Sequence, residues 1–560
     1  MPSRSDSVSR LAPTQGWRPA ALILLVGCWL ALAGNLALWR TVWPLPELAG
    51  ARGVLFAVGL SVWIVAALQV VLSLVAWKWL LKPVLLLLVL TAAANSYFML
   101  QYGVVIDATM MANVANTDAR EVRDLLSWTM LLIVLVLGVL PAWWLLRQKL
   151  ALRSFWPQAW RNLAGAAVGL TVLLLVTLLM YQDLASLMRN HKQVRYLVNP
   201  LNTLYASGKL AGDSLFHVSK TLQPIGLDAR PGASYAASKR APLVVLVVGE
   251  TARAANFSLG GYARPTNPQL QRLSASGSGQ LTYYSAVRSC GTNTQTSLPC
   301  MFSHLGKDGY EASRQPYENL LDVLQRAGLA VLWIDNQSGC KGLCDRVAHV
   351  DTYGLKTPGL CVDGECFDEV MLQGLDQRIA TLDPARRARG VVLVLHQMGS
   401  HGPAYYRRTP PAFKTFMPEC TSNVLQDCAR EQLVNAYDNT IVYTDHVLAG
   451  VAQWLQGKAH DSAYDTAMVY VSDHGESLGE NNLYLHGLPY ALAPDTQTHV
   501  PMVSWISDAM RDRLGLRSDC LRARADDKLS HDNLFHALLG LLDVQTSLYR
   551  KELDWFAACR

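Results

Sequence analysis

Five long apolar segments dominate the first third of the chain. They lie near residues 17–39, 53–77, 80–100, 125–146 and 162–182, and each contains few or no charged residues. A helix needs about 20 apolar residues to cross a bilayer, so each segment is long enough to span one. A cleaved signal peptide explains the first segment less well, because four more apolar segments follow and no small-residue cleavage site ends it.

A different pattern begins after residue 240. Three short runs rich in Val and Leu, at 243–248, 391–395 and 467–472, are typical of buried parallel strands. Helical patterns lie between them, for example at 317–327 and 431–456. Strands that alternate with helices predict an α/β domain with a mostly parallel sheet.

The pattern therefore divides the chain into three parts. Residues 1–182 form a membrane domain, and residues 241–560 form a catalytic domain. Between them, residues 183–240 mix basic, aromatic and aliphatic positions, which favours short helices at the membrane interface followed by a linker rich in Gly, Ala, Ser and Pro at 231–238.

Composition and charge refine this picture. Hydrophobic residues make up 51% of the 560 residues and charged residues 16%, with a net charge of +6. No basic stripe alternates with aromatic residues, so we expect no nucleic-acid partner.

Basic residues near the spans predict the orientation in the membrane. Nine flank one side of the spans and four the other. The nine are Arg4, Arg10, Arg18, Lys78, Lys82, Arg147, Lys149, Arg153 and Arg161, and the four are Arg40, Arg52, Arg120 and Arg123. The positive-inside rule then puts the N-terminus in the cytoplasm, and five crossings put residues after 182 outside.

Cysteine positions support an oxidising compartment for the second half. Ten of the eleven cysteines follow residue 289, and Cys28 is the exception. Eight of the ten form close pairs, which predicts disulfides 290–300, 340–344, 361–366 and 420–428, with 520–559 left by elimination. A thiolate zinc cluster is the weaker alternative, since no CxxC occurs and the spacings are irregular.

Metal-capable residues follow all three predicted strands. Glu250 follows the first, His396 ends the second, and Asp473 and His474 follow the third. Ligand sites in such sheets gather beyond the strand carboxyl ends. Two carboxylates and one imidazole form a set suited to zinc, with one position left open for a substrate or nucleophile.

A nucleophile for such a metal is offered by residues 289–300. This segment contains Thr292, Thr294 and Thr296 between Cys290 and Cys300, which predicts a tight, hydroxyl-rich loop. A bound metal lowers the pKa of a hydroxyl and stabilises the attacking alkoxide. Composition alone also fits a surface turn, and it does not choose among the three threonines.

Two histidines and one external segment complete the candidates. His401 and His486 lie shortly after strand ends that carry ligands, although a single loop histidine is more often an ordinary polar residue. In the external segment 101–124, Asn113, Thr117 and Glu121 recur every four residues and would share one face of a helix. That face is either a solvated surface or a polar strip toward a lipid headgroup.

Four strings carry a resemblance to a known family. They are Val248-Gly-Glu-Thr-Ala-Arg253, Ser289-Cys-Gly-Thr-Asn-Thr294 through Pro299-Cys-Met-Phe-Ser303, Leu395-His-Gln-Met-Gly-Ser-His-Gly-Pro403, and Ser472-Asp-His-Gly-Glu-Ser-Leu-Gly-Glu480. With these strings, the five spans and the terminal Cys559-Arg560, the chain resembles the phosphoethanolamine transferases of Gram-negative bacteria. That family belongs to the alkaline phosphatase/sulfatase-like superfamily, whose mostly parallel sheet carries helices on both faces.

The resemblance implies a role for each candidate residue. Glu250, Thr294, Asp473 and His474 would bind one zinc ion, and Thr294 would be the nucleophile. His401 and His486 would hold the phosphoryl group or a second zinc ion. Lys341 resembles the substrate-binding lysine of the family, and Asn113, Thr117 and Glu121 match positions implicated in binding the donor headgroup.

The resemblance also implies the reaction and its setting. Thr294 would take phosphoethanolamine from phosphatidylethanolamine, release diacylglycerol, and pass the group to lipid A or another lipopolysaccharide glycan. For lipid A the consequence would be polymyxin resistance. We expect a monomer in the bacterial inner membrane with its catalytic domain in the periplasm.

Three competing interpretations remain at this point. A sulfatase would carry Cys/Ser-x-Pro-x-Arg, which is missing near Thr294. A membrane phosphoglycerol transferase acting on an envelope glycan would differ mainly in the donor headgroup. A non-catalytic scaffold would have no need for the complete Glu, Thr, Asp and His set.

Overall fold

The computed structural model describes residues 16–48, 50–117, 119–216, 221–275, 280–352, 354–362, 364–461 and 463–560. The chain divides into two compact units. The N-terminal unit runs to Leu100 and includes Val105–Asp107 and Ser127–Gly208, whereas Gln101–Val104, Ala108–Leu126 and Lys209–Arg560 form the C-terminal unit. Arg4 and Arg10, which entered the orientation argument, lie outside the described residues.

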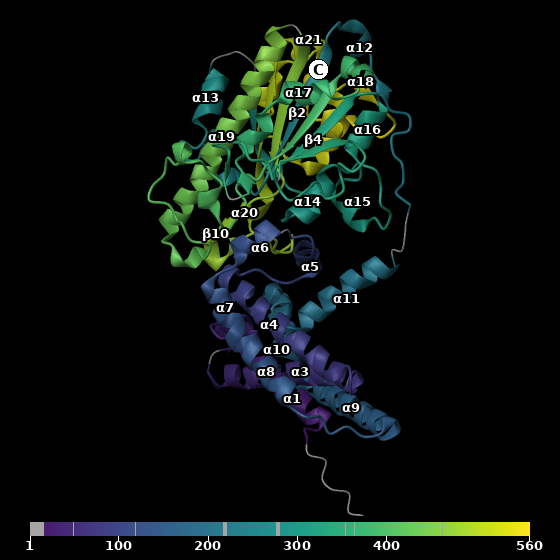
Figure 1. Cartoon of the computed structure of the whole chain (residues 1–560), viewed down its shortest axis with the longest axis vertical. Coiled ribbons are helices and arrows are strands. Elements are labelled where there is room, and N and C mark those ends of the chain that lie inside the picture. The colour runs from purple at the N-terminus through teal and green to yellow at the C-terminus, as the bar shows by residue number, and fades with distance from the viewer. Residues whose placement is uncertain are drawn as a thin grey trace, which may run out of the picture. The chain divides into compact units, whose positions relative to one another are not determined.

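Five helices of the N-terminal unit are long and apolar enough to cross a membrane, as predicted (Figure 1). The first span, Pro19–Val42, consists of α1 (Pro19–Leu32), a single 3-10 turn and α2 (Leu36–Val42). The second is α3 (Ala51–Leu74) and the third is α4 (Leu81–Tyr102). The fourth, Trp128–Arg147, joins α7 (Trp128–Val134) to α8 (Leu140–Arg147) through a π turn, and the fifth is α9 (Phe155–Leu179).

The fifth span begins seven residues before the predicted start at residue 162. Helix α9 begins at Phe155, so Pro157 lies in its first turn and Arg161 in its second. Proline is tolerated in a first turn because the N–H it lacks would have no intrahelical partner there. A long arginine side chain near a helix end reaches the polar interface, so Arg161 does not end the apolar helix.

Three further helical segments follow the spans. They are α10 (Tyr181–Asn190), a 3-10 helix at Lys192–Tyr196 and α11 (Leu201–Phe216). In the C-terminal unit, β1 (Arg230–Pro231) pairs with β14 (Val544–Gln545), and α12 (Ser234–Ala237) follows. Within the stretch 231–238, Pro231 thus pairs in β1 and Ser234–Ala237 form one helical turn.

An eight-stranded sheet organises the C-terminal unit, in the order β13-β3-β12-β9-β2-β8-β4-β5. Five neighbouring strands are parallel: β9 (Tyr464–Ser472), β2 (Ala241–Gly249), β8 (Val391–His396), β4 (Ala330–Asp335) and β5 (Ala348–Asp351). Strand β12 (His499–Ile506) runs antiparallel to β9 and to β3 (Gln280–Arg288), and β13 (Leu529–Ser530) pairs parallel with β3. The three predicted strands are thus β2, β8 and β9, and they are adjacent.

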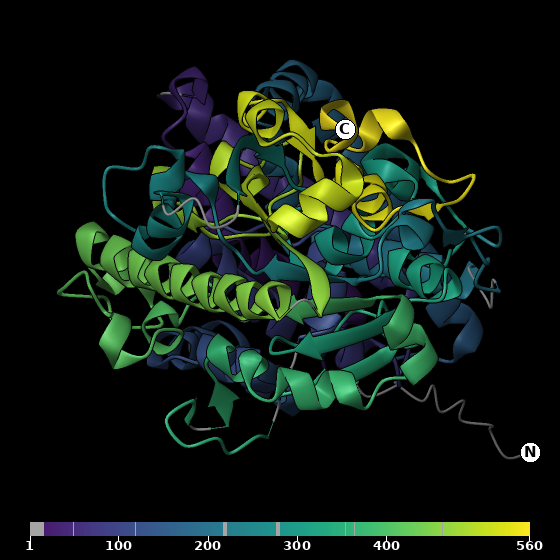
Figure 2. The same cartoon turned by 90° about the horizontal axis from the view of Figure 1, so that it is seen from above.

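Helices cover both faces of this sheet (Figure 2). Every residue of β2 from Pro242 to Gly249 is buried, and because side chains alternate between faces, both faces must be covered. The 31-residue helix α19 (Arg430–His460) packs against β9, and α16 (Leu320–Arg326) packs against β4. Val244, Leu246 and Val248 share a core cluster with α16 and α23 (Leu534–Leu541). Further α-helices of this unit are α13 (Pro268–Ala275), α14 (Thr294–Met301), α15 (Gly306–Ala312), α17 (Leu375–Ala380), α18 (Pro384–Arg389), α20 (Asp495–Thr498), α21 (Asp508–Leu514) and α22 (Ser518–Ala523).

All five predicted disulfides are present, namely Cys290–Cys300, Cys340–Cys344, Cys361–Cys366, Cys420–Cys428 and Cys520–Cys559. Cys361–Cys366 links β6 (Cys361–Val362) to β7 (Glu365–Cys366). Cys290–Cys300 ties the segment before α14 to the last turn of that helix. The thiolate zinc alternative is wrong for these cysteines.

Two local structures differ from those that the sequence predicts. The segment that carries Asn113, Thr117 and Glu121 is not one helix, because α5 (Ala108–Ala115) ends before Thr117 and α6 (Ala119–Leu125) starts again beyond it. At the end of α5 the Thr117 hydroxyl donates to the Asn113 carbonyl at 2.9 Å, and the backbone N–H of Thr117 bonds to the Val114 carbonyl, the i to i−3 pattern of a closing helical turn. The predicted Thr-rich loop is instead largely the helix α14.

Candidate active site

A buried cluster lies where β2 and β9 end. Val248 is in register with His396 and Val471, so the residues that follow these strands meet at one edge of the sheet. Glu250, Asp473 and His474 are fully buried there. The His474 Nε2 lies 3.4 Å from a Glu250 carboxylate oxygen and 3.3 Å from Asp473 Oδ2. Ligand atoms of the three residues lie within 4.8 Å of one another, which suits a metal ion.

The hydrogen bonds around this cluster leave lone pairs pointing inward. The His474 Nδ1 lies 3.0 Å from the Gly475 carbonyl, to which it donates, so a neutral ring carries its lone pair on Nε2. Asp473 uses Oδ1 to accept from the backbone of Thr251 and His474, whereas its buried Oδ2 has no hydrogen-bond partner. Converging acceptors of this kind fit a divalent cation, and two oxygens with one nitrogen suit zinc.

The electrostatics of the protein alone agree with a cation site. Burial and the neighbouring Asp473 charge raise the pKa of Glu250 to about 7. Burial lowers the pKa of His474, but the Asp473 and Glu250 carboxylates outweigh it and raise that pKa to about 9. The cluster therefore favours positive charge at its centre.

Thr294 supplies a hydroxyl to the same cluster. Its Oγ1 lies 3.1 and 3.2 Å from the Glu250 carboxylate oxygens and 3.4 Å from His474 Nε2. Of the three candidate threonines, Thr294 is the one whose hydroxyl makes these contacts. The Thr292 hydroxyl instead donates to the Leu488 carbonyl. The Thr296 backbone N–H donates to the Asn293 side chain, which caps the helix.

Helix α14 determines where Thr294 lies. Thr294 is the first residue of this eight-residue helix, and the Asn293 side chain caps it by accepting from the Thr296 N–H at 3.0 Å. In Figure 1, α14 lies below the labelled strands β2 and β4. Free N–H groups and the helix dipole make a helix N-terminus favourable for negative charge, such as an alkoxide or a phosphate.

His401 and His486 come together beside the cluster. Their ring centroids lie 5.8 Å apart, and His486 lies 4.3 Å from the His474 ring. Burial lowers the pKa of both rings well below the usual value, so both are neutral imidazoles near pH 7. The buried Nδ1 of His401 has no hydrogen-bond partner, which leaves it for a ligand.

Glu476 is a residue that the sequence reasoning missed. Its fully buried carboxylate pairs with His486 Nδ1 at 2.7 Å and accepts from the Tyr405 hydroxyl. It thereby fixes the ring of His486. Its position two residues after His474 was the one feature of the sequence that could have indicated a place in the active site.

The remaining predicted residues differ in how close they lie to the metal cluster. Glu121 approaches His401, with 3.9 Å between its Oε1 and Nε2, and also lies 3.4 Å from the Gln337 amide nitrogen. Lys341 donates to Ser338 at 2.9 and 3.1 Å and lines a cavity of about 690 Å³ with Pro299 of α14. Asn113 lies on α5 and Thr117 follows it, and the hydrogen bonds described for these two residues join them to each other and to neighbouring backbone groups of the same segment.

A buried ion-pair network holds the α6 segment within the C-terminal unit, and it too was missed. Asp124, which is 1% exposed, pairs with Arg407 at 3.0 Å and with Arg408. Arg408 also pairs with Glu365 at 2.8 Å. His396, a metal-capable candidate, pairs instead with Asp335 at 2.9 Å and lies outside the metal cluster.

Comparisons with known proteins agree with this architecture. Residues 64–215 match the family Phosphoethanolamine transferase EptA/EptB, and residues 242–544 match the Sulfatase family. The chain is 41% identical to Phosphoethanolamine transferase EptA of Escherichia coli K12 over 546 residues, covering 96% of this chain and 97% of the relative. It is 37% identical over 544 residues to Phosphatidylethanolamine transferase Mcr-1 of Escherichia coli, covering 94% and 95%.

Solved structures show the same fold. The integral membrane lipooligosaccharide phosphoethanolamine transferase A of Neisseria meningitidis matches with a TM-score of 0.89 and 38% identity, covering 96% of this chain and 98% of that one. The periplasmic domain of phosphoethanolamine transferase EptC of Campylobacter jejuni matches 60% of this chain at 39% identity with a TM-score of 0.51. The chain therefore belongs to the EptA family of phosphoethanolamine transferases, in the sulfatase/alkaline phosphatase superfamily, and is an integral membrane protein of five spans with a periplasmic C-terminal domain.

Proposed function

We propose that this protein transfers phosphoethanolamine from phosphatidylethanolamine to lipid A, or to another glycan of lipopolysaccharide, through a covalent bond to Thr294. The observation that carries the proposal is the Thr294 hydroxyl, 3.1 and 3.2 Å from the Glu250 carboxylate at the N-terminus of α14. Relatives at 41% and 37% identity over nearly the whole chain are named as phosphoethanolamine and phosphatidylethanolamine transferases. A relative at 26% identity is a Kdo(2)-lipid A phosphoethanolamine transferase.

Zinc is the cofactor that the donor set favours. Glu250, Asp473, His474 and the Thr294 hydroxyl would hold it, and the unpartnered Asp473 Oδ2 fits a ligand role. When bound, zinc supplies a lowered hydroxyl pKa and compensates negative charge. His401 and His486, both neutral, would bind phosphoryl oxygen or a second zinc ion.

The first half-reaction exchanges one phosphoester for another. The Thr294 Oγ attacks the phosphorus of phosphatidylethanolamine, and its proton leaves toward Glu250, the acceptor it already contacts. The bond between phosphorus and the glycerol oxygen breaks, and that oxygen takes the proton that Glu250 received, so diacylglycerol leaves. Phosphoethanolamine remains on Thr294, and the α14 N-terminus stabilises the charge that develops on the phosphoryl oxygens.

The second half-reaction returns the threonine to its free form. A phosphate or hydroxyl oxygen of the acceptor attacks the same phosphorus, and the bond to Thr294 Oγ breaks. The threonine oxygen takes back a proton. Neutral histidines beside the cluster can donate hydrogen bonds to the phosphoryl oxygens without adding a fixed charge.

The donor headgroup distinguishes this proposal from phosphoglycerol transfer. Glu121 places a carboxylate near His401, and a carboxylate attracts the ethanolamine ammonium but gains no charge attraction from neutral glycerol. We propose Glu121 as the ammonium contact, with Asn113 and Thr117 beside it, and Lys341 as a contact for acidic oxygens of a substrate.

Mass spectrometry tests the function directly. Lipid A from cells that produce the wild-type protein should gain phosphoethanolamine, and polymyxin resistance should rise with it. The Thr294→Ala protein should give neither effect while still folding, because the α14 cap and the Cys290–Cys300 disulfide remain. Thr296→Ala, which removes a nearby hydroxyl, is the matched control and should keep transfer.

The covalent intermediate provides a second readout. After incubation with phosphatidylethanolamine, the peptide that contains Thr294 should carry phosphoethanolamine. An adduct on Thr292 or Thr296, or lipid A modification by the Thr294→Ala protein, would disprove the assigned nucleophile. Transfer of phosphoglycerol in place of phosphoethanolamine would support the alternative donor.

A further inference from the structure

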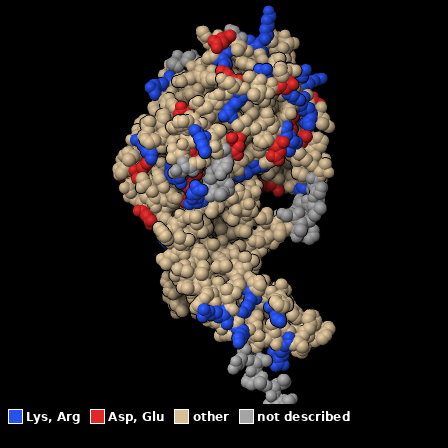
Figure 3. All heavy atoms as spheres, viewed as in Figure 1, with Lys and Arg blue, Asp and Glu red and all other residues tan. Residues whose placement is uncertain are grey.

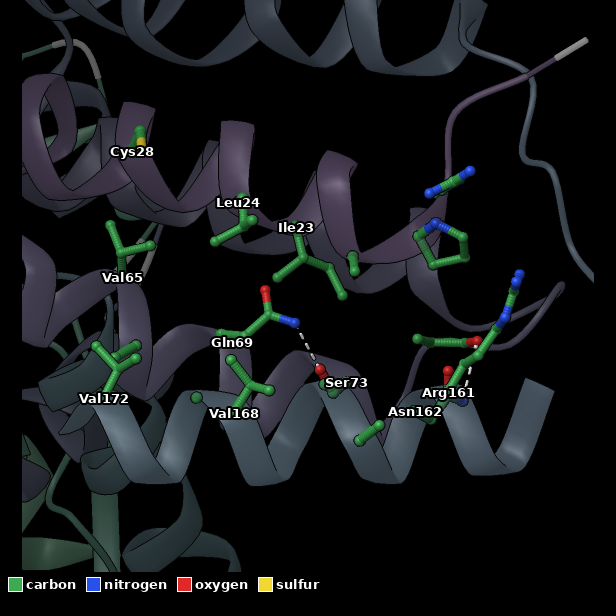
Figure 4. Close-up of a pocket in the computed structure, with 18 of the residues that line it drawn as sticks. Ile23, Leu24, Cys28, Val65, Gln69, Ser73, Arg161, Asn162, Val168 and Val172 are labelled. Atoms are coloured by element: carbon green, nitrogen blue, oxygen red, sulfur yellow. Dashed lines mark hydrogen bonds between the residues drawn. The ribbon is translucent and has the colours of Figure 1, made fainter. Parts of the chain in front are cut away.

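A groove in the N-terminal unit lies between three membrane spans, far in sequence from the active-site residues. It has a volume of about 600 Å³ and is lined by residues of α1, α3 and α9 (Figure 4). Apolar side chains such as Ile23, Leu24, Val65, Val168 and Val172 form most of its wall. The α9 residues that line the groove run from Gln158 to Val172, and between Arg161 and Val172 the helix rises about 16 Å, which is close to half of the ~30 Å hydrocarbon core. Its length thus fits an acyl chain of one leaflet.

One end of the groove is polar and basic. Arg18 at the start of α1 and Arg161 on α9 line this end, and both are exposed. Among the described residues, neither guanidinium has an ion-pair or hydrogen-bond partner. The backbone of Trp17 bonds to Lys149 at 2.8 Å, which brings a third basic residue to the same end. On the face drawn in Figure 3, Lys and Arg atoms gather at one end of this unit without Asp or Glu atoms among them.

Buried amides fix the position of Arg161. Asn162, the next residue, donates to the Ala76 carbonyl just beyond α3 at 3.2 Å, and it accepts from Gln158 at 2.8 Å. Both amides are buried and belong to the same wall as Arg161. This joint between α3 and α9 holds the arginine at the groove entrance.

Polar groups continue a short way into the groove. Gln69, 6% exposed, donates to the Ser73 hydroxyl at 2.8 Å, while its Oε1 has no hydrogen-bond partner. Ser73 lies three residues before Ala76, about 4.5 Å deeper along α3, and its own hydroxyl hydrogen is left to donate. An ester carbonyl just below a lipid phosphate would lie at this depth.

We propose that this groove binds one anionic glycerophospholipid, of the phosphatidylglycerol class, from the cytoplasmic leaflet. Because the C-terminal domain is periplasmic after five spans, Arg18 and Arg161 lie at the cytoplasmic ends of the first and fifth spans. The phosphate contacts these arginines, the ester region faces Ser73, and an acyl chain fills the apolar wall. Two or three cations with no acidic partner among the residues that the structure describes favour a net negative headgroup over the zwitterionic phosphatidylethanolamine. The site is separate from the proposed transfer reaction and does not depend on it.

Native mass spectrometry of the full-length protein in detergent, with equal amounts of phosphatidylglycerol and phosphatidylethanolamine, tests the site. One phosphatidylglycerol should remain bound, with a preference on the order of tenfold. Arg18→Gln with Arg161→Gln should remove that preference. Arg40→Gln with Arg189→Gln, which removes two exposed charges away from the groove, should keep it.

A second pair of variants tests the groove itself. Val168→Trp, on the groove wall, should displace the lipid, whereas Leu170→Trp, exposed on the same helix outside the groove, should not. Equal retention of the two lipids by the wild type would overturn the proposal, and so would unchanged phosphatidylglycerol binding in the double arginine variant. Unchanged binding by Val168→Trp would place the lipid elsewhere and would also overturn it. The melting temperature of each variant in detergent confirms that it is folded.

Discussion

At the residue scale, the active site is defined by acceptor atoms of Glu250, Asp473 and His474 that converge on one point. The Gly475 carbonyl orients His474 so that Nε2 faces Glu250 and Asp473, and the Thr294 oxygen completes the set. In a buried site, converging acceptors are costly unless a cation lies among them. This arrangement explains why a metal ion and the threonine that it would activate would occupy the same small site.

Replacing Asp473 with Asn should separate metal binding from folding. The Asn Oδ1 can still accept from Thr251 and His474, as Asp473 does at 3.2 and 2.7 Å, but the ligand charge is lost. We expect the zinc affinity to fall by roughly tenfold or more. Once zinc is removed by a chelator, the melting temperature of the Asp473→Asn protein should be close to that of the wild type. Metal analysis after dialysis measures this, with Asp495→Asn, an exposed carboxylate outside the cluster, as the control. Full zinc occupancy in Asp473→Asn would show that Asp473 is no ligand.

His531 should make the C-terminal domain sensitive to acid. Its Nδ1 accepts from the Cys290 N–H at 3.0 Å and its Nε2 donates to the Ser472 carbonyl at 2.9 Å, which requires a neutral ring. Burial lowers the pKa of His531 to about 4. Because that folded value lies below the unfolded one of about 6.5, the stabilisation is complete above pH 6.5 and is lost as pH falls toward 4, by at most about 3 kcal/mol.

Melting temperatures between pH 7 and pH 5 test this, with zinc removed by a chelator. The His531→Asn protein should melt lower than wild type at pH 7 but lose less on acidification. His460→Asn, an exposed histidine, should keep the wild-type slope. If His531→Asn and wild type lose stability in parallel, His531 is not the sensor.

At the element scale, the α14 cap links helix stability to catalysis. Asn293→Ala removes the side chain that accepts from the Thr296 N–H, which should cost about 1 kcal/mol. Since Thr294 is the first residue of α14, a frayed first turn should also move its hydroxyl, so the transfer rate should fall. Ser507→Ala removes the cap of α21, whose partner Thr466 lies at the opposite end of β9 from Asp473. It should lower stability while sparing the rate, and equal rate losses in both variants would contradict the positioning role of Asn293.

The sequence predicted the elements that have a strong hydrophobic pattern. The strands at 243–248, 391–395 and 467–472 were found because each is buried on both faces, and their shared edge placed Glu250, Asp473 and His474 together. The cysteine spacing was sufficient for the disulfides because short loops close easily. Metal candidates at strand ends were less specific, since His396 proved to pair with Asp335.

Features that depend on tertiary contacts could not be predicted. Choosing Thr294 from three threonines by pattern alone was impossible, because the choice follows from how α14 meets the end of β2. Glu476 and Asp124 gave no periodic signal, and their partners His486, Arg407 and Arg408 are distant in sequence or on another element. The break between α5 and α6 likewise gave no signal in the four-residue spacing of Asn113, Thr117 and Glu121.

At the scale of the whole molecule, charge and redox chemistry point to the same topology. All five disulfides lie in residues 290–559, in the part of the chain that a periplasmic location would oxidise. The basic residues flank the opposite ends of the spans. Since the two arguments rest on different residues, their agreement is stronger support than either gives alone.

Reporter fusions should confirm that topology loop by loop. Alkaline phosphatase, which is active only in the periplasm, should be active when fused after residue 50 or 240 and inactive after residue 79 or 150. The physical reason is that Lys78, Lys82, Arg147, Lys149 and Arg153 resist translocation, whereas the loop after the first span carries Arg40 and Arg52 alone. A cytoplasmic fluorescent reporter at the same four positions serves as the control and should give the reverse pattern. Phosphatase activity after residue 79 or 150 would invert the orientation of those spans, and it would also remove Arg161 from the cytoplasmic leaflet where the proposed lipid site requires it.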